Sequence, residues 1–167
     1  MALKETIAII ANQASRAEEI LRKLPGNQYR FLVFTALEDT KERLSEVGEG
    51  LAGKEIEFLT CMKDACWESD LVILDLQCSA ERKEASELIQ EVSVQKVVIC
   101  FEDRSEGRAE IEKIYQWLPH SKVVVVQGGA QTKEYKMEGR NSEALAEAGR
   151  LLGGAGFQTE VVTFKEN

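Results

Sequence analysis

A short polar turn after the first apolar run holds the residues best suited to bind a charged ligand. Residues 11–17, which read ANQASRA, separate an apolar stretch from a segment with helical periodicity. Free backbone N–H groups and the helix dipole favour an anion at the start of such a helix. Ser15 and Arg16 would add side-chain donors to a phosphate. The candidate phosphate-binding residues are Asn12, Gln13, Ala14, Ser15 and Arg16.

This turn lacks the glycines that usually let a backbone approach a dinucleotide. The usual fingerprint uses one glycine for the tight turn, one for close approach to the phosphate and one for helix packing. Counting from Asn12 places Asn12, Ala14 and Ala17 at these positions. Counting one residue earlier places the bulkier Gln13 and Arg16 there. We prefer the first register because its residues are small or tolerate a left-handed conformation.

Two further positions complete the candidate crevice. Thr35 ends the second predicted strand and is expected near an adenosine ribose, while Gln77 follows the fourth strand and is expected near a nicotinamide. The second strand ends on neither an acid for a ribose hydroxyl nor an arginine for a 2′-phosphate, so NADP is not favoured over NAD. The alternative interpretation is that Asn12 or Ser15 only caps a helix and that Arg16 is solvated.

The elements that would position these residues alternate along the chain. Short runs rich in β-branched residues are separated by helical stretches, which is typical of a mostly parallel sheet covered on both faces. We therefore predict an α/β fold with three layers and a doubly wound sheet of the Rossmann-like type. The predicted strands are 6–11, 29–35, 56–60, 71–76, 96–101 and 122–127, with weaker candidates at 134–138 and 158–164. The predicted helices are 17–24, 39–47, 80–91, 109–117 and 142–152.

Right-handed crossovers and a switch between the first and fourth strands predict the strand order 3-2-1-4-5-6. The last helix has the clearest end signals, with Asn141 or Ser142 as N-cap and Gly153-Gly154 at its C-terminus.

Two apolar C-terminal strands, 122–127 and 158–164, are expected at the edge of the sheet. Uncovered edges favour association, so we also expect a homodimer.

Composition and charge exclude several classes of function. The chain has 167 residues and a net charge of −8, which disfavours nucleic acid and anionic membrane surfaces as partners. Its longest apolar runs are far shorter than the roughly 20 residues of a membrane helix. We expect one soluble domain, residues 1–167.

The cysteines point to a reducing compartment and to no metal site. Cys61, Cys66, Cys78 and Cys100 lie beside or within apolar runs, and no signal-peptide pattern opens the chain, so a cytoplasmic location is expected. The single histidine, His120, is far from the cysteines in sequence, which argues against a zinc site. For the same reason no catalytic role is assigned to Cys78.

Several segments together resemble one family. Residues 67–77 (WESDLVILDLQ) are similar to a conserved strand and loop of NADP oxidoreductases that use the deazaflavin coenzyme F-420. Residues 118–124 (LPHSKVV) resemble the entry to that family's sixth strand, and residues 137–144 (MEGRNSEA) resemble the start of its last helix. The resemblance extends over most of the chain. It implies a Rossmann-like fold, NADP as cofactor and hydride transfer between two stacked cofactors.

The departures from the family leave two functional hypotheses. The glycine-rich loop is missing, Gln77 replaces a proline, and the segment after the sixth strand is reduced to residues 127–133. The first hypothesis is an NAD(P)-binding oxidoreductase with weak or altered cofactor binding and no assignable catalytic residue. The second is a binding or regulatory module on a degenerate Rossmann-like domain. Fold alone does not choose between them.

Overall fold

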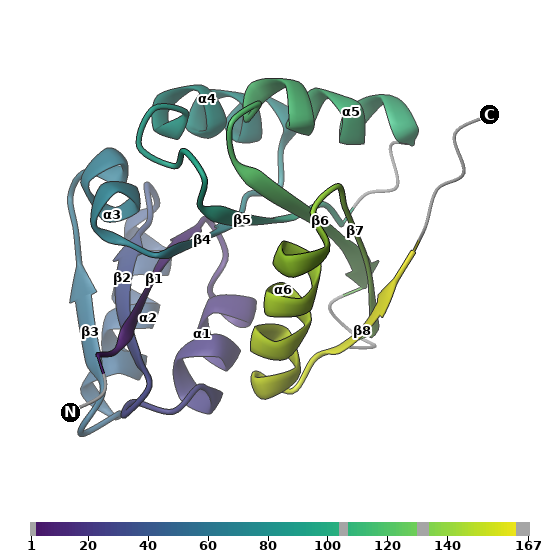
Figure 1. Cartoon of the computed structure of the whole chain (residues 1–167). Coiled ribbons are helices and arrows are strands. Elements are labelled where there is room, and N and C mark those ends of the chain that lie inside the picture. The colour runs from purple at the N-terminus through teal and green to yellow at the C-terminus, as the bar shows by residue number, and fades with distance from the viewer. Residues whose placement is uncertain (1–2, 104–106, 130–133, 163–167) are drawn as a thin grey trace.

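The computed structural model describes residues 3–103, 107–129 and 134–162, which form one mixed sheet with helices on both faces (Figure 1). The strands are β1 (Glu5–Ala11), β2 (Tyr29–Phe34), β3 (Glu55–Phe58), β4 (Leu71–Asp75), β5 (Val97–Phe101), β6 (Lys122–Gly129), β7 (Glu134–Gly139) and β8 (Gln158–Val161). The helices are α1 (Ala14–Lys23), α2 (Glu38–Glu49), α3 (Met62–Glu68), α4 (Ser79–Ile89), α5 (Arg108–Trp117) and α6 (Ser142–Gly154).

The strand order is β3-β2-β1-β4-β5-β6-β7-β8, which confirms the predicted order of the first six strands. These six run parallel, and β1 lies between β2 and β4. β7 pairs antiparallel with β6, and β8 pairs parallel with β7. The order therefore reverses between β1 and β4, where a doubly wound sheet opens its ligand crevice.

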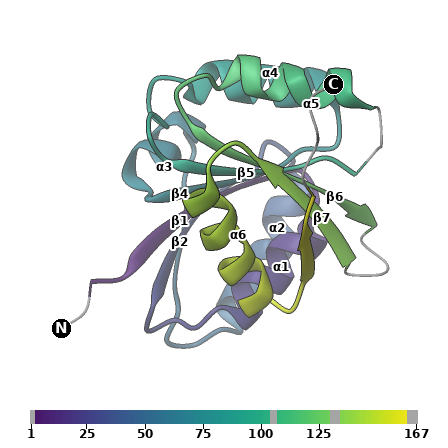
Figure 2. The ribbon, with the colours of Figure 1, turned by 45° about the vertical axis from the view of Figure 1, so that its right-hand side comes forward.

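Two apolar layers hold the helices on the sheet, as the three-layer prediction requires. Helices α1, α2 and α6 cover one face through residues that include Ile20, Leu44 and Leu151. Helices α3, α4 and α5 cover the other, with Ile89 and Ile114 among the buried residues (Figures 1 and 2). All residues of β4 and β5 are buried because helices pack on both sides of these central strands.

The structure corrects several expected boundaries. Helix α1 begins at Ala14, three residues before the predicted start. Helix α3 was not predicted, because seven residues with only two buried ones give no clear helical period. Asn141 caps α6, its Oδ1 accepting a hydrogen bond from Ala144 N at 2.9 Å. The helix runs through Gly154, and its left-handed terminating residue is Gly156, with φ of 87°.

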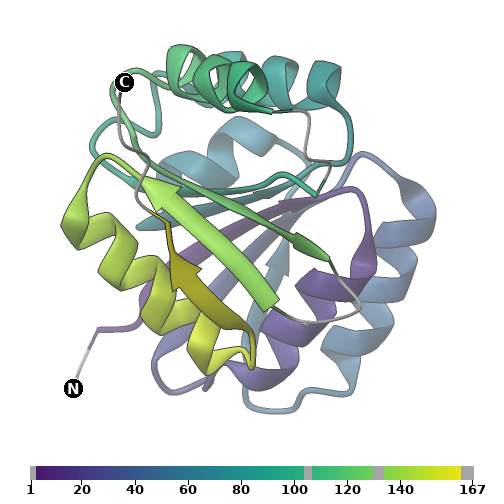
Figure 3. The same cartoon turned by 90° about the vertical axis from the view of Figure 1, so that its right-hand side faces the viewer.

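The expectation that residues 122–127 form an edge strand was wrong. β7 pairs with the outer edge of β6, so β6 lies inside the sheet. Figure 3 shows this part of the sheet from the side of β7 and β8. The edge strand on this side of the sheet is β8, and Val161 on it is exposed. Residues 163–164 of the last predicted strand and residues 130–133 after β6 lie outside the described residues.

A pair of carboxyl groups where β1 meets α6 predicts a pH-dependent stability. Burial, together with a hydrogen bond to Glu147 and the charge of that residue, raises the pKa of Glu5 from its usual 4.5 to about 7, against the opposing charge of Arg150. Between these two values the folded chain holds a proton that the unfolded chain has lost. The free energy of unfolding should therefore fall as pH rises from about 4.5 to 7.

Replacing Glu147 with Gln should flatten this pH dependence, because the amide carries no charge and can donate a hydrogen bond to ionised Glu5. Since Glu5 is partly solvated, we expect a change on the order of 1 kcal/mol. Urea denaturation between pH 4.5 and 7 measures it, with Glu143→Gln as the control at an exposed acid of the same helix. A wild-type stability that rises across this window would contradict the assignment.

Candidate functional site

The carboxyl ends of β1, β4 and β5 meet at the point where the strand order reverses, and a buried ion cluster occupies this place. Arg16, in the first turn of α1, extends to two carboxylates. Its Nε and Nη2 donate to Asp75 at 3.1 and 2.8 Å. Its Nη1 donates to Asp103 Oδ1 at 2.6 Å, and Nη2 also pairs with Asp103 Oδ2. One guanidinium thus bridges β4 and the loop after β5.

Aromatic rings complete the surroundings of this arginine. The guanidinium carbon of Arg16 lies 4.3 Å from the centre of the Phe101 ring and 5.9 Å from that of Tyr135. Arg16 is only 5% exposed, so the interpretation that it is solvated was wrong. Cation–π contact and two carboxylates together fix its position.

Charge is unevenly balanced within the cluster. Burial raises the pKa of Asp75, and the adjacent charge of Arg16 partly offsets this. Burial alone would lower the pKa of Arg16, but hydrogen bonds with Asp103 and the charge of Asp75 outweigh it and raise that pKa. With both carboxylates ionised, one cation faces two anions. Arg16 is therefore satisfied by the protein itself rather than poised for an external phosphate.

Asn12 forms hydrogen bonds to residues on both sides of the switch point. Its backbone N–H donates to Asp75 O at 3.2 Å, and its side-chain amide donates to Glu81 of α4 at 2.6 Å. Thr40 of α2 donates to Asn12 O at 2.8 Å. The N-cap of α1 is Gln13, whose side chain makes no capping hydrogen bond, so neither Asn12 nor Ser15 caps the helix. The polar groups of Asn12 are engaged across the switch point.

The other predicted site residues are distributed unevenly. Gln77 joins the cluster, with its amide 3.5 Å from Asp75 Oδ1. Ser15 is exposed and Ala14 half-buried at the helix start. Thr35 is not part of the cluster, because its hydroxyl accepts a hydrogen bond from Leu37 N at 3.2 Å and forms a local turn after β2. Five of the seven predicted residues therefore lie in the turn before α1 and in its first residues, whereas Gln77 joins the cluster only through Asp75 and Thr35 lies outside it.

We call the place where the strand order reverses the switch point, and we call it closed because the Arg16–Asp75–Asp103 cluster occupies it. An apolar cavity of about 520 Å³ lies beside this closed switch point, on the α4 side of the sheet. Ile10 and Asn12 line it from β1 and the following turn, and Leu37 lines it from the loop after β2. Phe34 at the end of β2 and Leu76 after β4 also line it. The remaining walls come from the start of α3 and from α4, and include Met62, Glu81, Glu84, Ala85 and Leu88. This cavity holds space for a small molecule, and its polar rim is acidic.

Sequence reasoning missed the two acids that bind Arg16. Asp75 ends an otherwise apolar and fully buried strand, and a charge in such a run needs a buried partner. That signal could have identified Asp75. It could not identify Asp103 or Tyr135, because their contribution depends on how β6 and β7 bring the start of β7 close to the end of β5.

The four thiols should differ sharply in reactivity. Burial raises the pKa of Cys66 and of Cys100 to about 12. Cys61 and Cys78 are exposed, near the apolar cavity and at the start of α4. We expect iodoacetamide to label Cys61 and Cys78 in the folded chain and all four cysteines after denaturation. Mass spectrometry of the labelled peptides measures this, and native labelling of Cys100 would contradict the burial of β5.

Two further classes of site were searched for in the described parts of the chain. No group of three or more histidine, cysteine or acidic side chains is arranged there to hold a metal ion. No helix within residues 3–103, 107–129 or 134–162 is long and apolar enough to span a membrane.

Comparison with known proteins gives the fold but no sequence family. Neither a protein-family model nor a curated protein matches the sequence. Among solved structures, a pyrroline-5-carboxylate reductase from Coxiella burnetii aligns with a TM-score of 0.73 and 14% identity, over 98% of this chain and 60% of that one. An imine reductase from Myxococcus stipitatus in complex with NADP+ aligns at 0.70 and 16%, over 94% and 54%.

A proposed F420-dependent NADP reductase from Arthrobacter aligns with a TM-score of 0.67 and 18% identity, over 93% of this chain and 82% of that one. The chain thus spans about 60% or less of the first two structures and most of the third. These similarities support a Rossmann-like fold of the kind found in NAD(P)-dependent reductases. At such identities they carry no conclusion about substrate or activity.

Proposed function

We propose that this chain is a non-redox binding module on a reductase-like fold, with a ligand pocket beside the switch point that the Arg16 cluster occupies. The Arg16–Asp75–Asp103 cluster carries this proposal. It fills the space over the ends of β4 and β5, where the second half of a dinucleotide would have to lie. The module would take a smaller ligand in the neighbouring apolar cavity.

Electrostatics argues against a dinucleotide at the start of α1. A pyrophosphate there would approach Asp75, Asp103 and Glu81, while the nearby cation, Arg16, is already shared between two of these acids. Dislodging Arg16 would leave Asp75 buried and unpaired, which is costly. The residues present therefore do not fit NAD or NADP, and no step of hydride transfer is assigned to them.

The apolar cavity suits a neutral or cationic aromatic compound of nucleoside size. Its volume is about 520 Å³, within the usual range for small-molecule sites. Glu81 and Glu84 at its rim would repel a phosphate and attract a cation. Adenosine is a suitable neutral probe, and AMP adds the phosphate that the rim should reject.

An NMR titration of the 15N-labelled chain tests this proposal. We expect adenosine to shift the backbone resonances of Leu37, Met62 and Leu88, and AMP to bind several-fold more weakly. Glu84→Gln should narrow this difference, whereas Glu87→Gln, an exposed acid of the same helix outside the cavity, should not. AMP or NADH binding more than about tenfold tighter than adenosine would overturn the proposal.

The second candidate is an NADP-dependent oxidoreductase related to the deazaflavin-dependent family. The resemblance in residues 67–77 and 118–124 supports it, as does the shared fold of the NADP+-bound imine reductase. Reduction of coenzyme F-420 by NADPH in the presence of the protein would favour this candidate over the binding module.

A further inference from the structure

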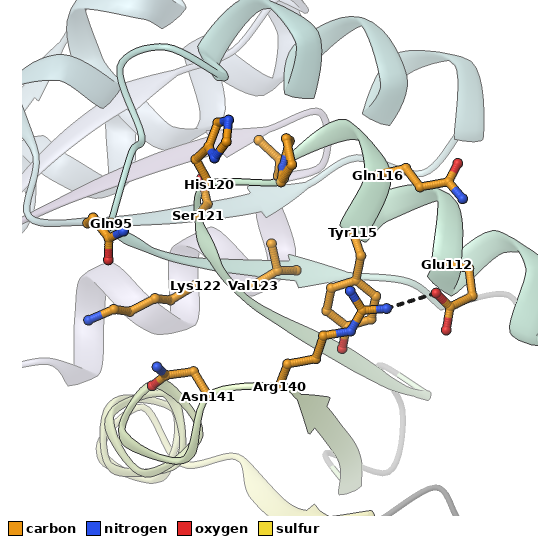
Figure 4. A pocket seen from close by; sticks show the side chains of 12 residues that line it. Gln95, Glu112, Tyr115, Gln116, His120, Ser121, Lys122, Val123, Arg140 and Asn141 are labelled. Atoms are coloured by element: carbon orange, nitrogen blue, oxygen red, sulfur yellow. Dashed lines mark hydrogen bonds and ion pairs between the residues drawn. The ribbon is translucent and has the colours of Figure 1, made fainter. Parts of the chain in front are cut away.

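A second cavity lies near the amino-terminal ends of the parallel strands β5 and β6, whereas the switch point lies at the carboxyl ends of the parallel strands. It has a volume of about 590 Å³ and lies at the start of β6, between the end of α5 and the junction of β7 with α6 (Figure 4). Figure 4 shows Gln95, Lys122 and Asn141 on one side and Tyr115 and Glu112 on the other, with Arg140 between them. Its walls are polar in part and carry two cations.

The β6–β7 pairing brings these cations together. Gly139 pairs with Val124, so Arg140 and Asn141 follow directly beside the start of β6, where Lys122 lies. A side chain at Gly139 would meet Val123 O at 2.9 Å and the Leu145 side chain at 3.3 Å. Glycine therefore permits the close approach of β7, β6 and α6 that forms the cavity.

The loops around the cavity are fixed by hydrogen bonds. Gln95 N donates to His120 O at 2.8 Å, and Lys122 N donates to Lys96 O at 2.9 Å. The Ser121 hydroxyl donates to Ser93 O at 2.9 Å. Gln95 has a φ of 63°, a left-handed conformation that is unfavourable for a residue with a side chain and is held here by this loop pairing. The cavity walls are therefore preorganised.

Positively charged side chains outnumber negatively charged ones in the lining of this cavity. Arg140 stacks on Tyr115, with its guanidinium carbon 4.1 Å from the ring centre, and donates from Nη2 to Glu112 at 2.9 Å. Among the described residues the Lys122 ammonium makes no hydrogen bond or ion pair. Asn141 uses its side-chain oxygen to cap α6, which leaves its amide NH₂ as a donor. Two cations thus face one carboxylate, in a chain with a net charge of −8.

We propose that this cavity binds a small organic anion, a carboxylate or a phosphate ester with an apolar body, through Lys122 and Arg140. The planar guanidinium suits an oxyanion, and the ammonium adds a point charge. Tyr115, Leu118 and Val123 supply an apolar wall for the body of the ligand. The site is independent of the switch point and of the apolar cavity beside it.

NMR titration of the 15N-labelled full chain with benzoate, phenyl phosphate and neutral benzamide tests the proposal. We expect benzoate or phenyl phosphate to shift the resonances of Gln116, Ser121, Lys122 and Asn141, and benzamide to bind at least about tenfold more weakly. The tighter of the two anions identifies the headgroup. Equal binding of benzamide, or no shifts at these residues at about 10 mM anion, would overturn the proposal.

Two variants and one control make the test specific. Lys122→Gln and Arg140→Gln should each weaken anion binding by roughly tenfold or more, because each removes a charge-assisted hydrogen bond. Lys63→Gln removes the same charge from an exposed position on α3 and should leave binding unchanged. Lys122 is half-buried at a strand start, so its variant stays informative if Arg140→Gln misfolds. Equal affinities for Lys122→Gln and Lys63→Gln would contradict the assignment.

Discussion

Replacing Arg16 with Met should lower the free energy of unfolding by about 3–5 kcal/mol. The substitution leaves the Asp75 carboxylate, 2% exposed, without its guanidinium partner. Asp103 is more accessible, with a side chain 26% exposed, and can turn to water. The loss should therefore come mainly from Asp75. Urea denaturation followed by circular dichroism measures it.

The double variant Arg16→Met with Asp75→Leu should recover much of this loss. Leu has the same number of side-chain heavy atoms as Asp, and an apolar pair can replace a buried ion pair at little cost. Arg22→Met on the same helix is the matched control, because Arg22 is exposed and its pair with Glu18 is worth less than about 1 kcal/mol. Equal effects of Arg16→Met and Arg22→Met would show that the cluster does not stabilise the fold.

Arg82→Met should destabilise the chain by a similar amount, about 3–5 kcal/mol. Arg82, in α4, is 2% exposed and donates to Leu76 O and to Glu110 Oε1, both at 3.0 Å. Glu102 Oε1 lies 4.0 Å from the same guanidinium. Removing Arg82 leaves buried Glu110 without this cation and the Leu76 carbonyl without this donor.

The neighbouring Lys83 provides the control for this second cluster. Its side chain is 57% exposed, and Lys83→Met should change stability by less than about 0.5 kcal/mol. Adding Glu110→Gln to Arg82→Met should restore part of the loss, because it removes a buried charge that then keeps, among the ion pairs of the described residues, only the longer one with Lys113, at 3.9 Å. If Arg82→Met unfolds at the same urea concentration as Lys83→Met, the buried pairing is not significant for stability.

The sheet could be predicted because its signals are local. Strands such as β4 and β5 are short, apolar and β-branched, and their order follows from crossover handedness. The interior position of β6 in the sheet could not be predicted, because it depends on whether β7 pairs with its outer edge. Similarly, α3 is short and largely exposed, and so has no periodic pattern to detect.

The candidate site was predictable in position but not in chemistry. The turn at residues 11–17 does lie at the switch point, as strand order requires. The role of Arg16 depends on contacts 59 and 87 residues away in sequence, to Asp75 and Asp103. An arginine in a phosphate-binding turn looks the same in sequence whether it faces a ligand or an internal acid.

Calorimetric titration with NADH and NADPH tests the closed switch point most directly. The turn lacks the glycines that let its backbone approach a pyrophosphate, and Arg16 donates to Asp75 and Asp103 instead. At least two charge-assisted hydrogen bonds to the pyrophosphate are therefore lost, each worth about 1.5–3 kcal/mol. We therefore predict dissociation constants in the millimolar range or weaker for both, with little discrimination between them. Submicromolar binding of either dinucleotide would contradict this account and would mean that Arg16 leaves Asp75 and Asp103 to form a phosphate site.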